Sequence, residues 1–364
     1  MKRVMVTTST RREVDQLVSF SLEHLPSLLL SSGLYCHDMT YEQREPRGES
    51  VRYSLMVLLG MQRAAQSGFR DLPDLDELWL RCLERQDSFS GGDLGLALWV
   101  DARREGAIVD MLLARLDPIV SSEEALGSLV GMEVAWILIG LAHVAGSHRR
   151  AEQPLDRVTE HLTRTRRAPS GMYYHDAASR FRRHLPNFAT QIYTLLALSR
   201  LARTGRAPNA REHARVLAEH LVRLQLPDGG WPWLFDADRA HVVEPYEVYT
   251  VHQDAMAPMA LLDFAELTGE SRWADASVAG LAWSRGQNEL EIDLLDIEQG
   301  FAHRSIRRRP PWDRLALASN SIMSRSLGRP LVRRPVSVEV NRTCRPYHLG
   351  WILEAWAGRQ VPDQ

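Results

Sequence analysis

The chain has 364 residues, and its content of 45% hydrophobic and 25% charged residues is typical of a globular protein rather than a disordered one. Lysine and arginine number 44 against 46 aspartates and glutamates, so the formal net charge is −2. This balance excludes a global basic field that would hold a nucleic acid or an anionic membrane, and any recognition of an anion must be local.

The sequence carries no feature that places it in or across a membrane. Its first residues are basic but lack the apolar core of a secretory signal. The longest apolar stretch, 134–144, contains a histidine and is too short to span a bilayer. Three cysteines are too few for a disulfide framework and fit a reducing compartment. We therefore expect a cytoplasmic protein with no membrane span and no nucleic-acid partner.

Apolar residues recur at helical spacing along almost the whole chain, and the predicted helices fall into two kinds. The first kind is amphipathic with one charged face, and we expect it on the outside at 12–31, 71–87, 107–117, 152–166, 209–225 and 271–285. The second kind is apolar nearly all round, and we expect it in the interior at 48–61, 91–100, 131–144, 185–198, 252–265 and 345–357. Six such pairs predict an all-α (α/α)6 barrel or toroid of helical hairpins, formed by 1–364 as one domain. An open helical array is the alternative, although the drifting repeat distance favours closure.

The segment 286–345 separates the last two interior helices and is either a lid or a structural insertion. Its part 331–342 alternates apolar and polar residues, which predicts a short hairpin or an extended insertion before the last helix. Its arginine-rich part 304–314 is punctuated by prolines and is interpreted as a solvated rim loop.

Polar residues concentrate at the starts of the interior helices. If these helices run the same way round a ring, their first turns share one mouth and form a pocket with a polar rim and an apolar floor. A helix-capping role explains some of them singly, but arginine, tyrosine, histidine and glutamine are not capping residues. The set is Glu49, Arg52, Tyr53, Asp93, Glu133, Asn187, Gln191, His252, Gln253, Asp254, Arg345, Tyr347 and His348.

The segment 225–258 holds the densest group of chemically useful residues. Aromatic side chains there can stack on sugars or shield a cation, although Trp231 and Trp233 can equally wedge the loop between helices. Acidic residues and His252 crowd the same segment, a setting for shifted pKa values. The aromatic and titratable residues are Trp231, Trp233, Phe235, Glu244, Tyr246, Glu247, Tyr249, His252 and Asp254. Asp254 is the first candidate for an acid or base, with a plain capping role as its alternative.

A second polar cluster lies in 171–187, before the fourth interior helix. Its arginines are candidates for a carboxylate or phosphate, and a solvated charge run is the plainer interpretation. The cluster comprises Tyr173, Tyr174, His175, Asp176, Arg180, Arg182 and Arg183.

The sequence motifs give little support to a metal or cofactor site. The pairs Cys36 with His37 and Cys344 with His348 match zinc ligands in kind, but no CxxC or HExxH spacing accompanies them. GxGxxG after a strand, GxxxxGKS and GxSxG are absent. We expect neither a metal nor a cofactor.

The segment QLPDGGW at 225–231 resembles the QW-type repeat of terpenoid cyclase and prenyltransferase toroids, and it is similar to turns of the six-hairpin glycosidase-like barrels. Both resemblances imply the helix-pair fold more than an activity. The acid motif DxDD of class II cyclases has its nearest match in DLPDLDE (71–77), which we predict on an outer helix. A DDxxD site is missing, and no carbohydrate family's catalytic motif matches residue by residue.

The functional hypothesis is a carbohydrate-active enzyme, of glycoside hydrolase, lyase or epimerase type, that acts on a small molecule or oligosaccharide. Carboxylates such as Asp254 and Glu247 serve as general acid and base, with His252 and Glu49 as further catalytic candidates. The substrate-binding candidates are Arg52, Tyr53, Asn187, Gln191, Trp231, Trp233, Tyr249, Gln253, Arg345, Tyr347 and His348. Among them, we expect Trp231, Trp233 and Tyr249 to form a sugar platform, and Arg52 and Arg345 to hold an anionic substituent. One alternative is a terpene or isoprenoid cyclase with an Asp or Glu acid, and the other is a non-catalytic helical scaffold.

Overall fold

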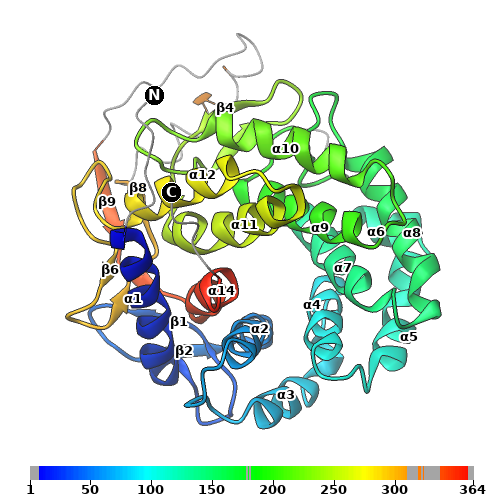
Figure 1. Ribbon diagram of the computed structural model, residues 1–364, viewed down its shortest axis with the longest axis horizontal. Coiled ribbons are helices and arrows are strands. Elements are labelled where there is room, and N and C mark those ends of the chain that lie inside the picture. Colours follow the sequence, from blue (N-terminus) through cyan, green and yellow to red (C-terminus); the bar gives the residue numbers. More distant parts are fainter. Residues whose placement is uncertain are drawn as a thin grey trace.

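The computed structural model describes residues 8–177, 179, 182–309, 319–320, 323 and 337–359. Its helices form two concentric rings (Figure 1). The outer ring contains α1 (Thr8–His24), α3 (Leu75–Leu83), α5 (Val109–Val120), α8 (Glu152–His161), α10 (Ala210–Leu224) and α12 (Arg272–Ser284). The inner ring contains α2 (Val51–Gln66), α4 (Gly91–Ala102), α7 (Gly131–Val144), α9 (Phe188–Arg203), α11 (Ala257–Thr268) and α14 (Pro346–Trp356).

The inner ring is closed. Around it, α2 packs on α4, α4 on α7, α7 on α9, α9 on α11, α11 on α14, and α14 returns to α2. A π-helical turn, η5 (His252–Met256), leads directly into α11. A short helix, α6 (Glu123–Ser128), joins α5 to α7. The predicted (α/α)6 barrel is confirmed, and the open array is wrong because the first and last inner helices are in contact.

The burial of each helix follows its sequence pattern. Every residue of α7 from Val134 to Leu141 is buried, as expected for a helix that is apolar on all sides. The outer helix α10 instead buries one stripe at helical spacing, formed by Ala210, Ala214, Leu217, Ala218 and Leu221. Hydrophobic burial on both sides of the inner ring therefore holds the two rings together.

Glycines allow the inner helices to approach backbone to backbone. A Cβ on Gly60 of α2 would lie 2.0 Å from the carbonyl oxygen of Gly350 on α14. Likewise, a Cβ on Gly140 of α7 would lie 2.2 Å from the carbonyl oxygen of Gly95 on α4. Closure of the ring therefore depends on the absence of side chains at these contacts.

Arginines close the end of the barrel where the inner helices finish. Arg103 donates to the carbonyl of Leu59 at 3.0 Å and forms a two-pronged pair with Glu354 at 2.7 and 2.8 Å. Arg63 donates to the carbonyl of Ala357 at 3.0 Å. These contacts tie α2, α4 and α14 to one another.

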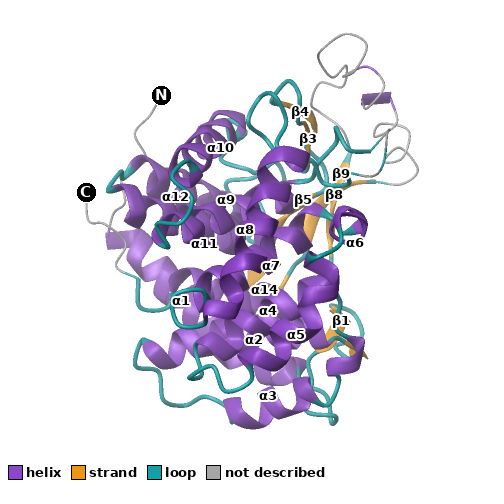
Figure 2. Ribbon diagram, turned by 90° about the vertical axis from the view of Figure 1, so that its right-hand side faces the viewer, coloured by secondary structure: helices purple, strands orange, loops and turns teal. Residues whose placement is uncertain are grey.

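Short strands gather at the other end of the barrel (Figure 2). One sheet has the order β10-β1-β2, from β1 (Cys36–Thr40), β2 (Pro46–Glu49) and β10 (Thr343–Cys344). A second has the order β5-β8-β9, from β5 (Val248–Tyr249), β8 (Ser305–Arg308) and β9 (Val338–Asn341). Two hairpins complete the set, β3 (Leu234–Asp236) with β4 (His241–Glu244) and β6 (Leu295–Asp296) with β7 (Phe301–Ala302).

The predicted insertion before the last helix is present as this β5-β8-β9 sheet. The predicted rim loop is wrong over 305–308, because these residues form the central strand β8 between β5 and β9. The remainder of that loop, 310–314, and the first part of the extended segment, 331–336, lie outside the described residues. Among the described residues, no helix combines the length and the apolar character needed to cross a membrane.

Candidate functional site

The inner helices begin where their polar residues predict. Ser50 caps α2 by accepting a hydrogen bond from the backbone N–H of Tyr53, and Asn187 caps α9 in the same way through Thr190. Ser90 and Asp93 form a reciprocal capping box at the start of α4. These caps hold the first turns of the inner helices around one space at the strand-bearing end of the barrel.

A cavity of about 250 Å³ occupies that space. Its lining is Arg52, Tyr53, Met56, Met132, Trp136, Asn187, Ala189, Tyr193, Trp233, Tyr249, His252, Met256, Arg304, Arg345 and Tyr347. Nine of these fifteen side chains are arginine, tyrosine, asparagine or histidine, and the described lining includes neither leucine nor phenylalanine. The cavity is therefore built to form hydrogen bonds on several sides.

Eight residues predicted from the sequence line this cavity together. They are Arg52, Tyr53, Asn187, Trp233, Tyr249, His252, Arg345 and Tyr347. They come from α2, α9, α14, η5 and the loops before them, which agrees with the convergence expected of inner-helix starts. Trp233 and Tyr249 meet edge to face, with ring centroids 5.8 Å apart.

His252 is the histidine of the described cavity lining. It begins η5, is 5% exposed, and packs against Phe188 and Tyr249 with ring centroids 4.8 and 5.0 Å away. Burial, and then the positive charge of Arg304 and the neighbouring His348, lower its pKa to about 3. The imidazole is therefore neutral at physiological pH, and its buried Nδ1 has no partner among the described residues.

Arg52 faces the cavity but its charge is already matched. Its guanidinium donates to Asp93 at 2.6 and 3.2 Å, to Glu133 at 3.3 Å and to the hydroxyl of Ser90 at 2.9 Å. The two carboxylates lie behind the arginine rather than on the cavity wall. Arg52 is thus held firmly, but it is not the free cation that an anionic substituent requires.

The carboxylates predicted to be catalytic do not line the cavity. Glu49 ends β2 and pairs with Arg85 at 3.0 Å near the surface. Asp254 is fully buried, and its carboxylate lies 2.7 Å from Nε2 of His348. Glu247 accepts hydrogen bonds from Asn341, at 2.9 Å, and from Ser305.

The different positions of these acids have a physical reason. The strand β2 turns Glu49 away from the first turn of α2. The π-helical turn η5 adds a residue relative to an α-helical turn, and Asp254 lies behind His252 against α14 rather than beside it. His348 shares this buried position and does not line the cavity.

Three further predicted binding residues brace loops instead. Gln191 holds the backbone of Tyr173 from both sides, at 3.0 and 2.6 Å. Gln253 accepts from the backbone N–H of Trp231 at 2.7 Å and donates to the carbonyl of Tyr249 at 2.9 Å. Trp231 itself is fully buried against Phe188, with centroids 5.4 Å apart, so it supports the loop rather than offering a face to a ligand.

The remaining predicted features also have structural partners. Glu244 is buried against Arg308, at 2.9 Å, and Asn320, at 2.8 Å. In the 171–187 cluster, the hydroxyl of Tyr174 donates to Asp238 at 2.6 Å, and Arg180 lies outside the described residues. Neither group lines the cavity.

The turn of QLPDGGW fastens an outer helix to its neighbour. Gln225 donates to the carbonyl oxygens of Gly229, at 2.7 Å, and Ala276 of α12, at 2.9 Å. Gly229 has a φ of +92° and approaches the carbonyl of Ala279, which no side chain would allow. The motif therefore serves the barrel and not the cavity.

No metal centre is formed by the described residues, since they contain no group of three or more His, Cys, Asp or Glu side chains that could hold an ion. Burial raises the pKa of the Cys36 thiol to about 11 and that of Cys344 to about 12, so both thiols stay protonated. The zinc pairs considered from the sequence therefore lack further ligands.

Several lining residues were missed by the sequence analysis. Arg304 belongs to the segment interpreted as a solvated loop, and the β5-β8-β9 sheet carries it to the cavity instead. Trp136 and Tyr193 lie more than a turn into α7 and α9, where aromatic residues look like ordinary core. The sequence feature that indicates them is their spacing: each lies four residues after a first-turn residue, Met132 or Ala189, that lines the same wall.

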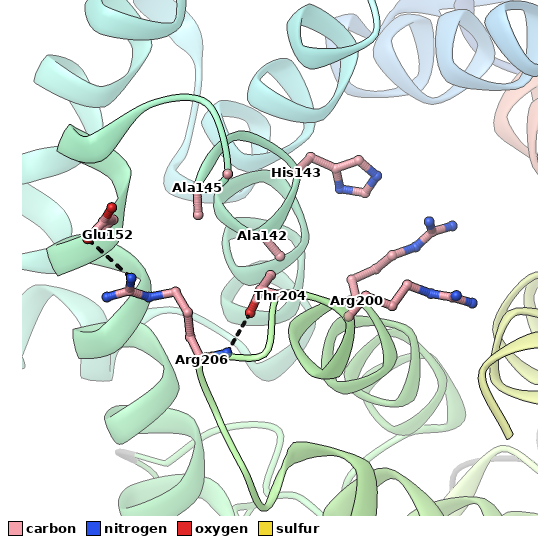
Figure 3. A pocket seen from close by; sticks show the side chains of 9 residues that line it. Ala142, His143, Ala145, Glu152, Arg200, Thr204 and Arg206 are labelled. Carbon is pink, nitrogen blue, oxygen red and sulfur yellow. Dashed lines mark hydrogen bonds and ion pairs between the residues drawn. The ribbon is translucent and has the colours of Figure 1, made fainter.

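A second pocket, of about 550 Å³, lies at the opposite ends of α7 and α9 (Figure 3). Its arginines are all paired with carboxylates. Arg200 lies 2.8 Å from Asp263, and Arg206 lies 3.1 Å from Glu152. These guanidinium groups therefore already have carboxylate partners, in contrast to an arginine without an ion pair.

No protein-family model matches the chain, and no curated protein matches it in sequence. Solved structures do match in fold. A sugar epimerase from a ruminal bacterium is 11% identical with a TM-score of 0.63, and the match covers 94% of this chain and 97% of that one. The cellobiose 2-epimerase of Bacillus thermoamylovorans is 10% identical with a TM-score of 0.63, covering 94% and 98%. An unsaturated glucuronyl hydrolase specific for heparin is 13% identical with a TM-score of 0.61, covering 94% and 96%.

The matches run over nearly the full length of each chain. They confirm the resemblance to the six-hairpin glycosidase-like barrels at the level of the fold.

Proposed function

We propose that the chain is a carbohydrate-active enzyme of the epimerase type, which moves a proton on a small sugar bound in the cavity. The observation that carries the proposal is the cavity wall itself, where aromatic faces, hydrogen-bond donors and a neutral imidazole surround about 250 Å³. This volume lies below the usual range for drug-sized ligands, which favours one or two sugar rings over a longer chain.

The composition of the wall disfavours the two other functions. A cyclase cavity needs an almost wholly apolar surface around a hydrocarbon, whereas most of the described lining here is polar. A scaffold needs an open groove, whereas the inner ring here is closed.

Proton transfer fits the site better than hydrolysis. Glycoside hydrolysis requires two carboxyl groups that flank the glycosidic bond. None of the described lining residues is an aspartate or glutamate. The buried Nδ1 of His252 has no hydrogen-bond partner among the described residues, which makes His252 the candidate to accept a proton from a carbon next to a carbonyl group.

The charge that develops on the sugar oxygen needs donors already in place. The guanidinium of Arg52 and the hydroxyls of Tyr53 and Tyr347 face the same space as His252. The buried Asp254–His348 pair lies outside the described lining, so His252 is the imidazole that reaches the sugar. Two of the solved structures with this fold are sugar epimerases, which agrees with the proposal.

Three unpaired cysteines, all buried, support a reducing and hence cytoplasmic location.

Solvent exchange tests the reaction directly. Incubation of reducing mono- and disaccharides with the protein in D₂O should place deuterium on the carbon next to the carbonyl, as followed by ¹H NMR. His252→Gln should abolish this exchange, while His148→Gln, beyond the far end of α7, should not. If His252→Gln exchanged as fully as the wild type, the proposed role of His252 would be wrong. If the wild type exchanged no sugar, the epimerase type would be wrong.

A further inference from the structure

Arg304 and Arg345 line the cavity without a carboxylate partner. Among the described residues, neither guanidinium lies within ion-pair distance of an aspartate or glutamate, in contrast to Arg52 with its two carboxylates. Arg103, for comparison, is paired with Glu354 and donates to a backbone carbonyl of α2. The cavity therefore holds two arginines that form no direct ion pair among the described residues, and the charge of Glu247 acts on Arg304 without contacting it.

Both side chains are held in place. The backbone of Arg304 bridges two strands, donating to Asn341 at 3.0 Å and accepting from Thr250 at 2.9 Å, and its guanidinium lies 5.0 Å from the centre of the Tyr249 ring. Arg345 precedes α14 and donates to the hydroxyl of Tyr53 at 2.5 Å. Fixed guanidinium forks of this kind suit the two oxygens of a carboxylate or phosphate.

Each guanidinium has a donor that is not used. Nη1 of Arg304 and Nε of Arg345 are buried and have no hydrogen-bond partner among the described residues. A buried cationic donor without an acceptor is unfavourable, because it has lost water and gained nothing in exchange. An acceptor supplied by a bound ligand would satisfy both.

The carboxylates near the cavity do not supply that acceptor. Asp93 and Glu133 bind Arg52, and Asp254 binds His348. Glu247 is occupied by Asn341 and Ser305. The described wall thus presents guanidinium groups to a ligand, with the carboxylates behind it.

We infer that the substrate is a small anionic sugar, whose carboxylate or phosphate group lies between Arg304 and Arg345. The inference rests on the proposed function and adds a charge class to it. Arg304 and Arg345 bind the anionic group, and Arg52 remains with His252 at the reacting carbon.

Calorimetric titration with matched sugars tests this inference. The probes are glucose and galactose, their uronates glucuronate and galacturonate, and glucose 6-phosphate, all at low ionic strength. We expect at least one acidic sugar to bind ~10-fold or more tightly than its neutral counterpart, and the advantage to shrink as salt is added. The uronate and phosphate arms identify which anionic group the site takes.

Variants assign the preference to the two arginines. Arg304→Gln and Arg345→Gln should each lower the affinity for the acidic sugar ~10-fold or more, with a much smaller change for the neutral one. Arg345→Lys keeps the charge and loses the fork, so it should lie between wild type and Arg345→Gln. Arg307→Gln is the matched control, because Arg307 lies on β8, the strand that directly follows Arg304, but is exposed and pairs with Glu339. Thermal unfolding checks that each variant is folded.

The outcomes separate this inference from the proposed function. Equal or tighter binding of the neutral sugars by wild type overturns the anionic substrate and leaves a sugar site standing. An acidic preference that survives in both glutamine variants overturns the role of Arg304 and Arg345. Failure of every sugar to bind overturns the proposed function, and the anionic substrate with it.

Discussion

Replacing Gly60 by alanine puts a methyl group where α2 touches α14. That Cβ would lie 2.0 Å from the carbonyl oxygen of Gly350 and 2.8 Å from its carbonyl carbon, far inside the 3.4 Å of an ordinary contact. The obstacle is backbone, so relief requires the two helices to separate. Overpacking of this kind costs about 1–3 kcal/mol, and backbone contact places it at the upper end. Because alanine gains ~1 kcal/mol over glycine in a helix, we expect a net loss of about 2 kcal/mol.

Urea unfolding followed by circular dichroism measures this loss. The matched control is Gly127→Ala in α6, where a Cβ would meet nothing within 4 Å, so the variant should be unchanged or slightly stabilised. The unfolding midpoint of Gly60→Ala should fall with an unchanged slope. A Gly60→Ala protein as stable as Gly127→Ala would refute the claim that the ring closes on glycine contacts.

Three further predictions follow from burial and charge. Stability should fall as pH drops below about 6.5, because the unfolded histidines gain protons there while His252 and His303, with pKa values near 3 and 4 in the fold, do not. Each of these histidines changes the free energy of unfolding by up to ~1.4 kcal/mol per pH unit. His252→Gln should therefore weaken the pH dependence of the free energy of unfolding, as measured by urea titrations at several pH values. Arg103→Met should lower the free energy of unfolding by about 3–5 kcal/mol, since it leaves Glu354 buried and unpaired, and recovery in Arg103→Met/Glu354→Met is the control. Trp233→Ala should weaken sugar binding in calorimetry by ~10-fold while the unfolding midpoint changes little, and unchanged affinity would contradict a sugar platform there.

The architecture was predictable because the way in which a helix is buried determines the spacing of its apolar residues. Interior helices such as α7 are apolar on every side, and outer helices such as α10 have one buried stripe, so the two rings can be sorted by composition alone. The starts of the inner helices were predictable for the same reason, which is why Arg52, His252 and Arg345 were placed at one end of the barrel.

The identity of the groups that face the cavity was less predictable. Along 247–254 the direction of each side chain depends on a short strand and then a π-helical turn, and neither leaves a periodic signal. Asp254 thus points behind the wall while His252, two residues earlier, points into it. Arg304 was hidden for a related reason, because its strand pairs with segments distant in the sequence.

A crystal structure of the protein with a bound sugar tests the central claim most directly. Glucuronate and glucose 6-phosphate are the ligands to soak, with glucose as the neutral comparison. We predict density for the sugar ring in the cavity between Trp233 and His252, with any acidic group between Arg304 and Arg345. Density only in the arginine-lined pocket at the opposite ends of α7 and α9, or an empty cavity at saturating ligand, would contradict it.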